Sequence, residues 1–338
     1  MIYNTNKMKN LKAVTINQDE SVANAKMYLK RAVNIGARTT SGRARFDQSK
    51  LLSMIPWEQN TKQEIKYTIL AAESFRISGE QYWFDSAEAY EHAAALYADV
   101  LNDPKSAAGY YEEAGKVMEK VDTDFATKYF RHAITRHCDA SQYENGAMLQ
   151  ERLANNLDKK KNYAAAIQEY HRATKLLYAA NMKDRAIQAL GRAAYLLAAV
   201  GKFRESADAY ETVAQRQEEQ SMETSVKIGA SGLILRGGIL LICDSLEKSE
   251  IIGWRELKSF LQRIDSVHFD FDKSPEQQKL LDIHQSLSGG DIDKFVDTVY
   301  SLDDDLCGLD NVVIDALDRI KDVITKRHEK ADTHAKER

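Results

Sequence analysis

The sequence predicts an all-α protein in which pairs of helices stack side by side and a helical bundle closes the array. Three observations support this. The 338 residues are 43% hydrophobic but include only 3 Pro and 16 Gly, a composition that suits helices with a substantial core. No segment alternates apolar and polar residues with a period of two. A repeat of about forty residues occupies the middle of the chain.

The repeat is marked by aromatic residues at expected helix starts, namely Phe84, Phe125, Tyr163 and Phe203. Alanines follow each aromatic at helical spacing, which lets neighbouring helices approach closely, and we expect the aromatics themselves to be mostly buried. One helix pair cannot bury its apolar stripe alone, so the pairs must stack into a superhelix. Because the period is near the roughly 34 residues of tetratricopeptide repeats, the expected fold is a tetratricopeptide-like solenoid.

Residues 67–222 are expected to hold these helix pairs. Asp103 before Pro104 predicts a helix cap followed by a first-turn proline, and Ser274 before Pro275 repeats the pattern. The repeat ends near residue 222, and residues 223–325 are expected to form an acidic helical bundle. Within this bundle, Gly229–Leu246 is expected to be a buried helix. The most apolar stretch of the chain, Ile228–Cys243, contains Arg236 and three glycines and is expected to be too short and too interrupted to span a membrane.

The two ends of the chain differ in net charge. Residues 1–66, a basic N-terminal segment, hold 12 Lys and Arg against 5 Asp and Glu, whereas residues 265–318 hold 14 Asp and Glu against 3 Lys. Residues 326–338 form a basic tail that is expected to be disordered. The opposite charges suit partners of opposite sign. A nucleic-acid binder would spread its basic surplus along a groove, so no nucleic acid is expected.

Candidates for chemistry are few. Cys138, Cys243 and Cys307 lie far apart in apolar contexts and are expected to be free thiols in a reducing compartment. With no secretory signal, a cytoplasmic protein, peripheral to membranes, is expected. His132 and His137 are five residues apart and would diverge on a helix, so no metal site is expected. No glycine-rich loop ends in Lys-Ser or Lys-Thr, and neither a cofactor nor enzymatic activity is predicted.

The C-terminal third resembles a known family. Residues 274–324 contain Ser-Pro-Glu-Gln-Gln-Lys-Leu-Leu-Asp-Ile-His, later Gly-Asp-Ile-Asp-Lys-Phe-Val-Asp-Thr-Val-Tyr, and finally Leu-Asp-Arg-Ile-Lys. This order resembles the C-terminal bundle of the soluble NSF attachment proteins, particularly the alpha type, and residues 162–170 and 201–211 are similar to that family's repeats. The resemblance implies an adaptor that binds SNARE four-helix bundles. It also implies that the adaptor recruits and stimulates the hexameric ATPase NSF for SNARE disassembly in vesicle fusion and trafficking.

Several positions depart from the family pattern. The alpha type has a leucine near its C-terminus, where this chain has Ala331 followed by further residues, and the family's Phe- and Gly-rich N-terminal loop has no close match. Met148 stands at a family lysine, and Gln285 and Ser286 replace two family acids. The departures predict a divergent member.

A SNARE bundle is an acidic rod, so the expected contact surface is a row of cations. Arg185 and Arg192 are seven residues apart and share a helix face, and Arg192 aligns with a basic position of the family. The full predicted set is Arg152, Arg172, Lys175, Arg185 and Arg192. A solvated outer helix face is the alternative interpretation.

The acidic bundle is the expected docking surface for the ATPase. Asp282 matches an acidic family position after two leucines, and the predicted set is Asp282, Asp291, Asp293, Asp303, Asp304 and Asp305. Such concentrated like charge opposes folding, which suggests a basic partner. The alternative is a helix face that only confers solubility.

A membrane contact is expected in the N-terminal segment, which combines cations with bulky apolar residues: Arg43, Arg45, Phe46, Leu51, Leu52 and Trp57. This composition suits an anionic membrane surface. Alternatively, residues 51–57 pack onto the first helix pair.

The sequence also allows a different function, that of a generic tetratricopeptide-like scaffold. Such a scaffold would capture acidic peptide tails with a Lys/Arg carboxylate clamp.

Overall fold

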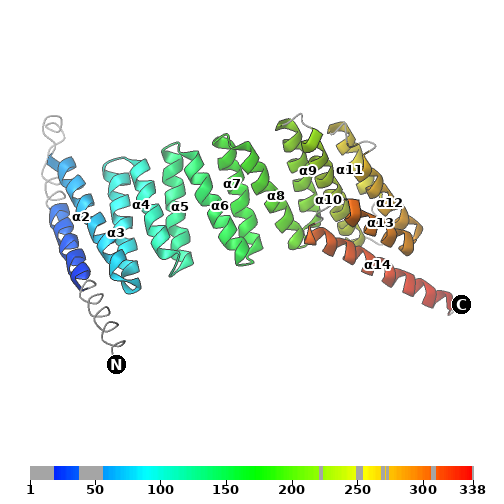
Figure 1. The fold of residues 1–338 in the computed structure, drawn as a ribbon, viewed down its shortest axis with the longest axis horizontal. Coiled ribbons are helices and arrows are strands. Elements are labelled where there is room, and N and C mark those ends of the chain that lie inside the picture. The colour runs from blue at the N-terminus through cyan, green and yellow to red at the C-terminus, as the bar shows by residue number, and fades with distance from the viewer. Residues whose placement is uncertain are drawn as a thin grey trace, which may run out of the picture. The chain divides into compact units, whose positions relative to one another are not determined.

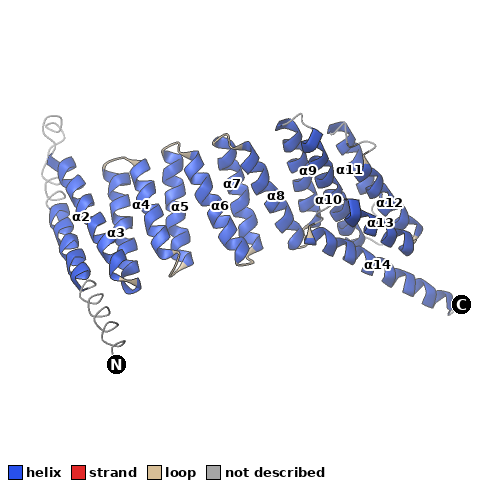
Figure 2. Cartoon of the chain, in the orientation of Figure 1, coloured by secondary structure: helices blue, strands red, loops and turns tan. Residues whose placement is uncertain are grey.

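The structure, a computed structural model, describes residues 19–37, 56–220, 224–248, 254–267, 271, 274–305 and 310–336, with only the backbone at some helix ends. Every regular element in these ranges is helical, as predicted (Figure 2). The chain divides into two compact units, Met1–Leu153 and Ala154–Arg338, and the division falls inside helix α6.

The first unit is a row of antiparallel helices that pack in chain order, α2 on α3, α3 on α4 and α4 on α5 (Figure 1). A helix over residues 19–37 comes first. The elements that follow are α2 Pro56–Ser78, the 3-10 turn η2 Glu80–Tyr82, α3 Trp83–Ala95, the π-helical turn η3 Leu96–Val100, α4 Pro104–Met118, α5 Thr123–Asp139 and α6 Tyr143–Lys159.

The second unit continues the antiparallel pattern and then adds the predicted bundle. Helix α7 packs on α8, α8 on α9, and α9 on α10. The elements are α7 Tyr163–Ala179, α8 Lys183–Ala199, α9 Phe203–Gln220, α10 Thr224–Lys248, α11 Trp254–Val267, α12 Pro275–Gly289, α13 Ile292–Asp305 and α14 Asn311–Lys336. The fold class that the sequence predicts, an all-α helical repeat with a C-terminal bundle, is confirmed.

One turn geometry recurs between successive helices. Ser141, Lys161, Asn181 and Gly201 each adopt a positive φ, and the next helix begins two residues later. After α7, the Met182 N–H donates to the carbonyl of Leu177, and equivalent bonds close the other three turns. This is the geometry of a helix C-terminus closed by a left-handed residue.

The helix starts follow the chemistry predicted from the sequence. The Asp103 carboxylate accepts a hydrogen bond from the Ser106 N–H at 3.1 Å, and Pro104 begins α4. The Ser274 hydroxyl accepts from the Gln277 N–H, also at 3.1 Å, before Pro275 begins α12. Each cap satisfies a backbone donor that a helix leaves open, which fixes where the chain turns.

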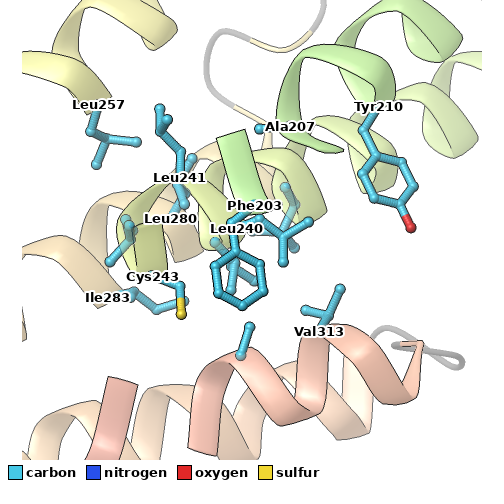
Figure 3. Close-up of a cluster of buried hydrophobic side chains, with 14 of the residues drawn as sticks. Phe203, Ala207, Tyr210, Leu240, Leu241, Cys243, Leu257, Leu280, Ile283 and Val313 are labelled. Atoms are coloured by element: carbon cyan, nitrogen blue, oxygen red, sulfur yellow. The ribbon is translucent and has the colours of Figure 1, made fainter. Parts of the chain in front are cut away.

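The largest core of buried side chains lies in the second unit and joins the last repeat to the bundle (Figure 3). Phe203 of α9 and Leu240 of α10 meet Leu280 of α12 and Val313 of α14 in this core. The bundle is therefore held to the repeat by apolar burial, as expected.

Helix α10 explains the apolar stretch of the sequence. Residues Gly229–Glu247 are long and apolar enough to cross a membrane, contrary to the expectation, but 72% of the stretch is buried inside the structure. At Gly237 an added Cβ would lie 3.3 Å from the Ala207 carbonyl oxygen, so glycine allows α10 to approach α9 closely. A core helix of a folded domain accounts for this composition.

Two expectations need correction. Phe203 is buried and Tyr163 half-buried, but Phe84 and Phe125 are each 45% exposed. Both phenylalanines lie in the first turn of a helix, where their rings pack edge to face on each other, 5.8 Å apart, and leave their outer sides open.

The second correction concerns the C-terminal tail, residues 326–338, which was predicted to be disordered. It instead continues α14 as helix to Lys336, which agrees with its many Lys, Glu and Ala residues.

Candidate functional site

The predicted SNARE-facing cations lie on three helices, Arg152 on α6, Arg172 and Lys175 on α7, and Arg185 and Arg192 on α8. Lys175 is exposed and forms no ion pair with any residue in the described part of the chain, whereas Arg185 is half-buried. Arg172 pairs with Glu169, whose side chain is almost fully buried. These cations therefore differ in burial and in whether they form ion pairs within the chain.

Arg192 is built into the second unit. Its Nε donates to Asp158 Oδ2 at 2.8 Å, and its guanidinium lies 4.5 Å from the centroid of the Tyr195 ring. The Tyr170 hydroxyl donates to Asn155 Oδ1 at 2.6 Å and lies 3.4 Å from the same Asp158 oxygen. The hydrogen bond to Asp158 raises the pKa of Arg192. The network joins α6, α7 and α8.

Arg152 plays the same part in the first unit, one helix pair earlier in the sequence. Its Nε donates to Glu119 Oε1 at 3.1 Å, a second nitrogen contacts the other carboxylate oxygen, and its guanidinium lies over the Phe130 ring. The carboxylate partner is 33 residues earlier for Arg152 and 34 residues earlier for Arg192. The two arginines therefore occupy equivalent positions and link helices within their own units.

Glu119 and Asp158, the partners of these arginines, were missed by the sequence analysis. The signal was present, because the interval between the two acids nearly equals the interval between the two arginines. A search for charges of opposite sign that recur with the period of the repeat would have found both bridges.

The predicted ATPase-docking acids have different environments. Asp282 is half-buried and accepts from the Gln278 amide at 3.0 Å. Asp291 caps α13 by accepting from the Lys294 N–H at 2.9 Å. Asp293 is exposed on the first turn of that helix, and it pairs with no cation among the described residues. The side chains of Asp303, Asp304 and Asp305 lie outside the described residues.

Another acid of this region is structural. Asp310 accepts from the Tyr210 hydroxyl at 3.3 Å and lies 3.4 Å from Arg236 Nε, which ties the start of α14 to α9 and α10. Burial raises the pKa of Tyr210, which therefore stays protonated and able to donate. In contrast, the side chains of several other acids of α13 and α14 are exposed, as that of Asp293 is: Asp297, Asp315, Asp318 and Asp322.

A shallow hollow of about 520 Å³ lies on α12 and is lined by Leu281, His284, Gln285 and Ser288. Gln285 and Ser288 are exposed, whereas His284 is buried and its pKa is lowered by burial. Asp282 follows Leu281 directly in the sequence. The bundle therefore presents exposed acids together with a hollow of mixed polar and apolar lining.

The structure describes only some of the other residues singled out in the sequence, those of the predicted membrane contact and the two histidines. Arg43, Arg45, Phe46, Leu51 and Leu52 lie outside the described residues, and Trp57 is described only by its backbone in α2. His132 stacks on Tyr111, and His137 Nδ1 lies 3.0 Å from Gln142 Oε1. Within the described ranges, no three His, Cys, Asp or Glu side chains form a group that could hold a metal ion.

Comparison with known proteins gives the family context. The family model for soluble NSF attachment proteins matches residues 48–325. An alpha-soluble NSF attachment protein from Vitis vinifera is 21% identical over 247 residues, which cover 71% of this chain and 82% of that protein. A probable vesicular-fusion protein sec17 homolog from Neurospora crassa is 22% identical over 236 residues, covering 70% of this chain and 77% of that protein.

Proposed function

Because this chain belongs to the soluble NSF attachment protein family, we propose that it is an adaptor that binds SNARE complexes and recruits and stimulates the ATPase NSF. The family match covers the repeats and most of the bundle, the two parts that such an adaptor needs. The adaptor has no chemistry of its own in this proposal. It holds a helical substrate and presents it to the ATPase, which does the mechanical work in vesicle fusion and trafficking.

The observation that carries the proposal is the exposed acidic surface of α13 and α14. Asp293, Asp297, Asp315, Asp318 and Asp322 are all exposed, so these charges are available to a basic partner. Like charges held together oppose folding, and a function at this surface explains their presence. Charge of this kind steers encounter more than it sets final affinity.

The docking test uses acids that the fold does not need. Changing Asp293 and Asp318 to Lys should weaken NSF binding and its stimulated ATP hydrolysis, most strongly at low salt. Asp291 is left intact because it caps α13. The matched control changes Glu88 and Glu144, two exposed acids of the first unit, to Lys. Full stimulation by the Asp293 and Asp318 variant would remove the acidic surface as the docking site.

The SNARE surface is proposed on α7 and α8, with Lys175 and Arg185 as the first residues to test. Lys175→Glu should weaken SNARE-bundle binding and reduce its dependence on salt, and the fold should tolerate the change because Lys175 is exposed. Reversal of Arg172 or Arg192 is a poorer test, because both arginines pair with largely buried carboxylates. Capture of acidic peptides without capture of a SNARE bundle would favour the generic scaffold instead.

A peripheral membrane location is proposed for the N-terminal segment. Changing Leu51, Leu52 and Trp57 to Ser should reduce flotation with vesicles that contain an anionic lipid. Unchanged flotation would show that these residues pack on the protein or serve another purpose.

A further inference from the structure

The helix over residues 19–37 leaves one face without a partner among the described residues. Val22, Ala25 and Ala32 are buried. Beside this buried face lie Lys26, Lys30 and Val33, spaced at i, i+4 and i+7 and therefore in one line along the helix, C-terminal to the buried Val22. Both lysines are exposed and form no ion pair with any described residue, and the Val33 side chain is 63% exposed. No acidic residue occurs between positions 21 and 37.

Helix α13 carries the opposite pattern at the same spacing. Asp293, Asp297 and Tyr300 also stand at i, i+4 and i+7, while Phe295 is buried on another face. The two aspartates are exposed without an ionic partner in the described ranges, and Tyr300 is 69% exposed. Among the described bulky apolar residues only Ile77, at 70%, is as open as Tyr300.

We propose that these two strips bind each other between copies of the chain, so that the N-terminal helix of one copy docks on α13 of a second copy. In a parallel register, Lys26 faces Asp293, Lys30 faces Asp297, and Val33 packs against the Tyr300 ring. The two ion pairs set the register, and the apolar pair packs at one end of the contact. The proposal does not depend on the proposed adaptor function.

A protein partner fits the N-terminal strip better than a lipid surface does. Helices that rest in a membrane interface usually carry Trp, Phe and Leu opposite many cations. This strip has two lysines and one valine, flanked by Met27 and Leu29, which are each 38% exposed. A matching strip with opposite charge exists on the same chain, whereas the described part of the N-terminal helix exposes no Trp or Phe that could anchor it in lipid.

The contact joins two different surfaces, so a pair of copies that forms it once leaves one strip of each kind unused, whereas a two-fold pair would form it twice. Such heterologous contacts produce open chains of copies or closed rings. The contact is small and its ion pairs are exposed, so association should be weak and should fall as salt screens the charges. It also covers Asp293, which places self-association in competition with any partner that uses this acidic surface.

Sedimentation velocity of the full chain, at rising concentration and at low and high salt, measures the association. The first variant combines Lys26→Glu with Lys30→Glu, and the second combines Asp293→Lys with Asp297→Lys. Each alone should raise the dissociation constant roughly tenfold or more. An equimolar mixture of the two variants should associate again, as should the chain that carries all four changes. Restored association shows that the variants are folded and that the two strips meet.

Two controls decide the remaining outcomes. Val33→Ser and Tyr300→Ser should each weaken association, whereas Ile77→Ser, at an equally exposed apolar residue, should leave it unchanged. A wild-type chain that stays monomeric at every concentration and low salt overturns the proposal. So does a mixture of charge-reversed variants that fails to associate. If the lysine variant instead loses binding to phosphatidylserine vesicles while the wild type is monomeric, the strip belongs to a membrane contact and the proposal is wrong.

Discussion

At the scale of single residues, Arg192 shows how a candidate binding residue can serve the fold. Arg192→Gln leaves Asp158, whose side chain is 13% exposed, without this cation. We expect the free energy of unfolding to fall by about 1–3 kcal/mol, because a largely buried carboxylate then loses a charged hydrogen bond. Urea unfolding followed by circular dichroism measures the loss.

The matched control for Arg192 is Arg216→Gln. The Arg216 ion pair with Glu219 is about half exposed on both sides, so its removal should cost less than about 0.5 kcal/mol. Equal losses in the two variants would show that the Arg192 network stabilises the second unit no more than an exposed ion pair does.

Glu112 gives a prediction about pH in the first unit. The His137 imidazole, with Nε2 at 3.8 Å, and the Lys116 ammonium, at 2.7 Å, lower the pKa of Glu112 from 4.5 to about 2. Because the folded pKa is depressed, the stabilisation is complete above about pH 4.5 and is lost as the pH falls towards 2.

Urea midpoints measured from pH 6 down to pH values near 2.5 test the Glu112 prediction. In Glu112→Gln the midpoint should change less with pH than in the wild type. The exposed Glu88 provides the comparison, since Glu88→Gln should keep the wild-type slope. A wild-type slope in Glu112→Gln would rule out this carboxylate as a source of acid sensitivity.

These residues also mark the limit of sequence reasoning about the site. Charge type and helical spacing correctly placed Arg185 and Arg192 on one helix, α8. Spacing alone could not show that Asp158 holds Arg192, because that contact joins residues 34 positions apart and depends on tertiary packing. For Lys175 and Asp293, exposure agrees with the predicted roles, which remain predictions about partners.

At the scale of elements, the turns offer a paired test on glycine. Gly201 has a φ of 77° after α8, whereas Gly191 lies inside α8, where an added Cβ would meet no other atom within 4 Å. Gly201→Ala should lower the free energy of unfolding by about 1 kcal/mol, since alanine disfavours left-handed backbone. Gly191→Ala should raise it by about 1 kcal/mol through helix propensity.

Both glycine variants lie in the second unit and add one methyl group, so each is the control for the other. Denaturation midpoints should move in opposite directions. If both midpoints moved in the same direction, the left-handed backbone at Gly201 would not be the reason for a glycine at that position.

Helix boundaries were the most predictable elements because local chemistry fixes them. Asp103 and Ser274 cap helices through side chains only three residues away from their donors. The exposure of Phe84 could not be predicted in the same way. Its exposure depends on whether a neighbouring helix covers the outer face of the ring. The repeat pattern describes an average repeat and does not show which repeat lacks such a neighbour.

At the scale of the whole molecule, the two described cysteines report on the two units. Cys138 lies in the first unit and is half-buried, while Cys243 is buried in the large core of the second. Burial raises the pKa of the Cys243 thiol to about 12, so very little reactive thiolate forms at neutral pH.

We therefore expect a thiol reagent to modify Cys138 slowly in the native protein and Cys243 only when its core unfolds. Mass spectrometry of peptides, after brief labelling at increasing urea, separates the two sites. Native labelling of Cys243 at the rate of Cys138 would contradict the packing of α10.

Two structural features of the chain repeat with different periods, and together they determine which segment could be duplicated without disturbing the fold. The left-handed turns recur once per helix, but the Arg152 and Arg192 bridges recur once per helix pair. Duplication of a single helix with its turn would reverse the direction of every helix after it and separate an arginine from its acid. Duplication of a whole helix pair would preserve both direction and bridges. Growth of the gene by tandem duplication is therefore expected to proceed by helix pairs.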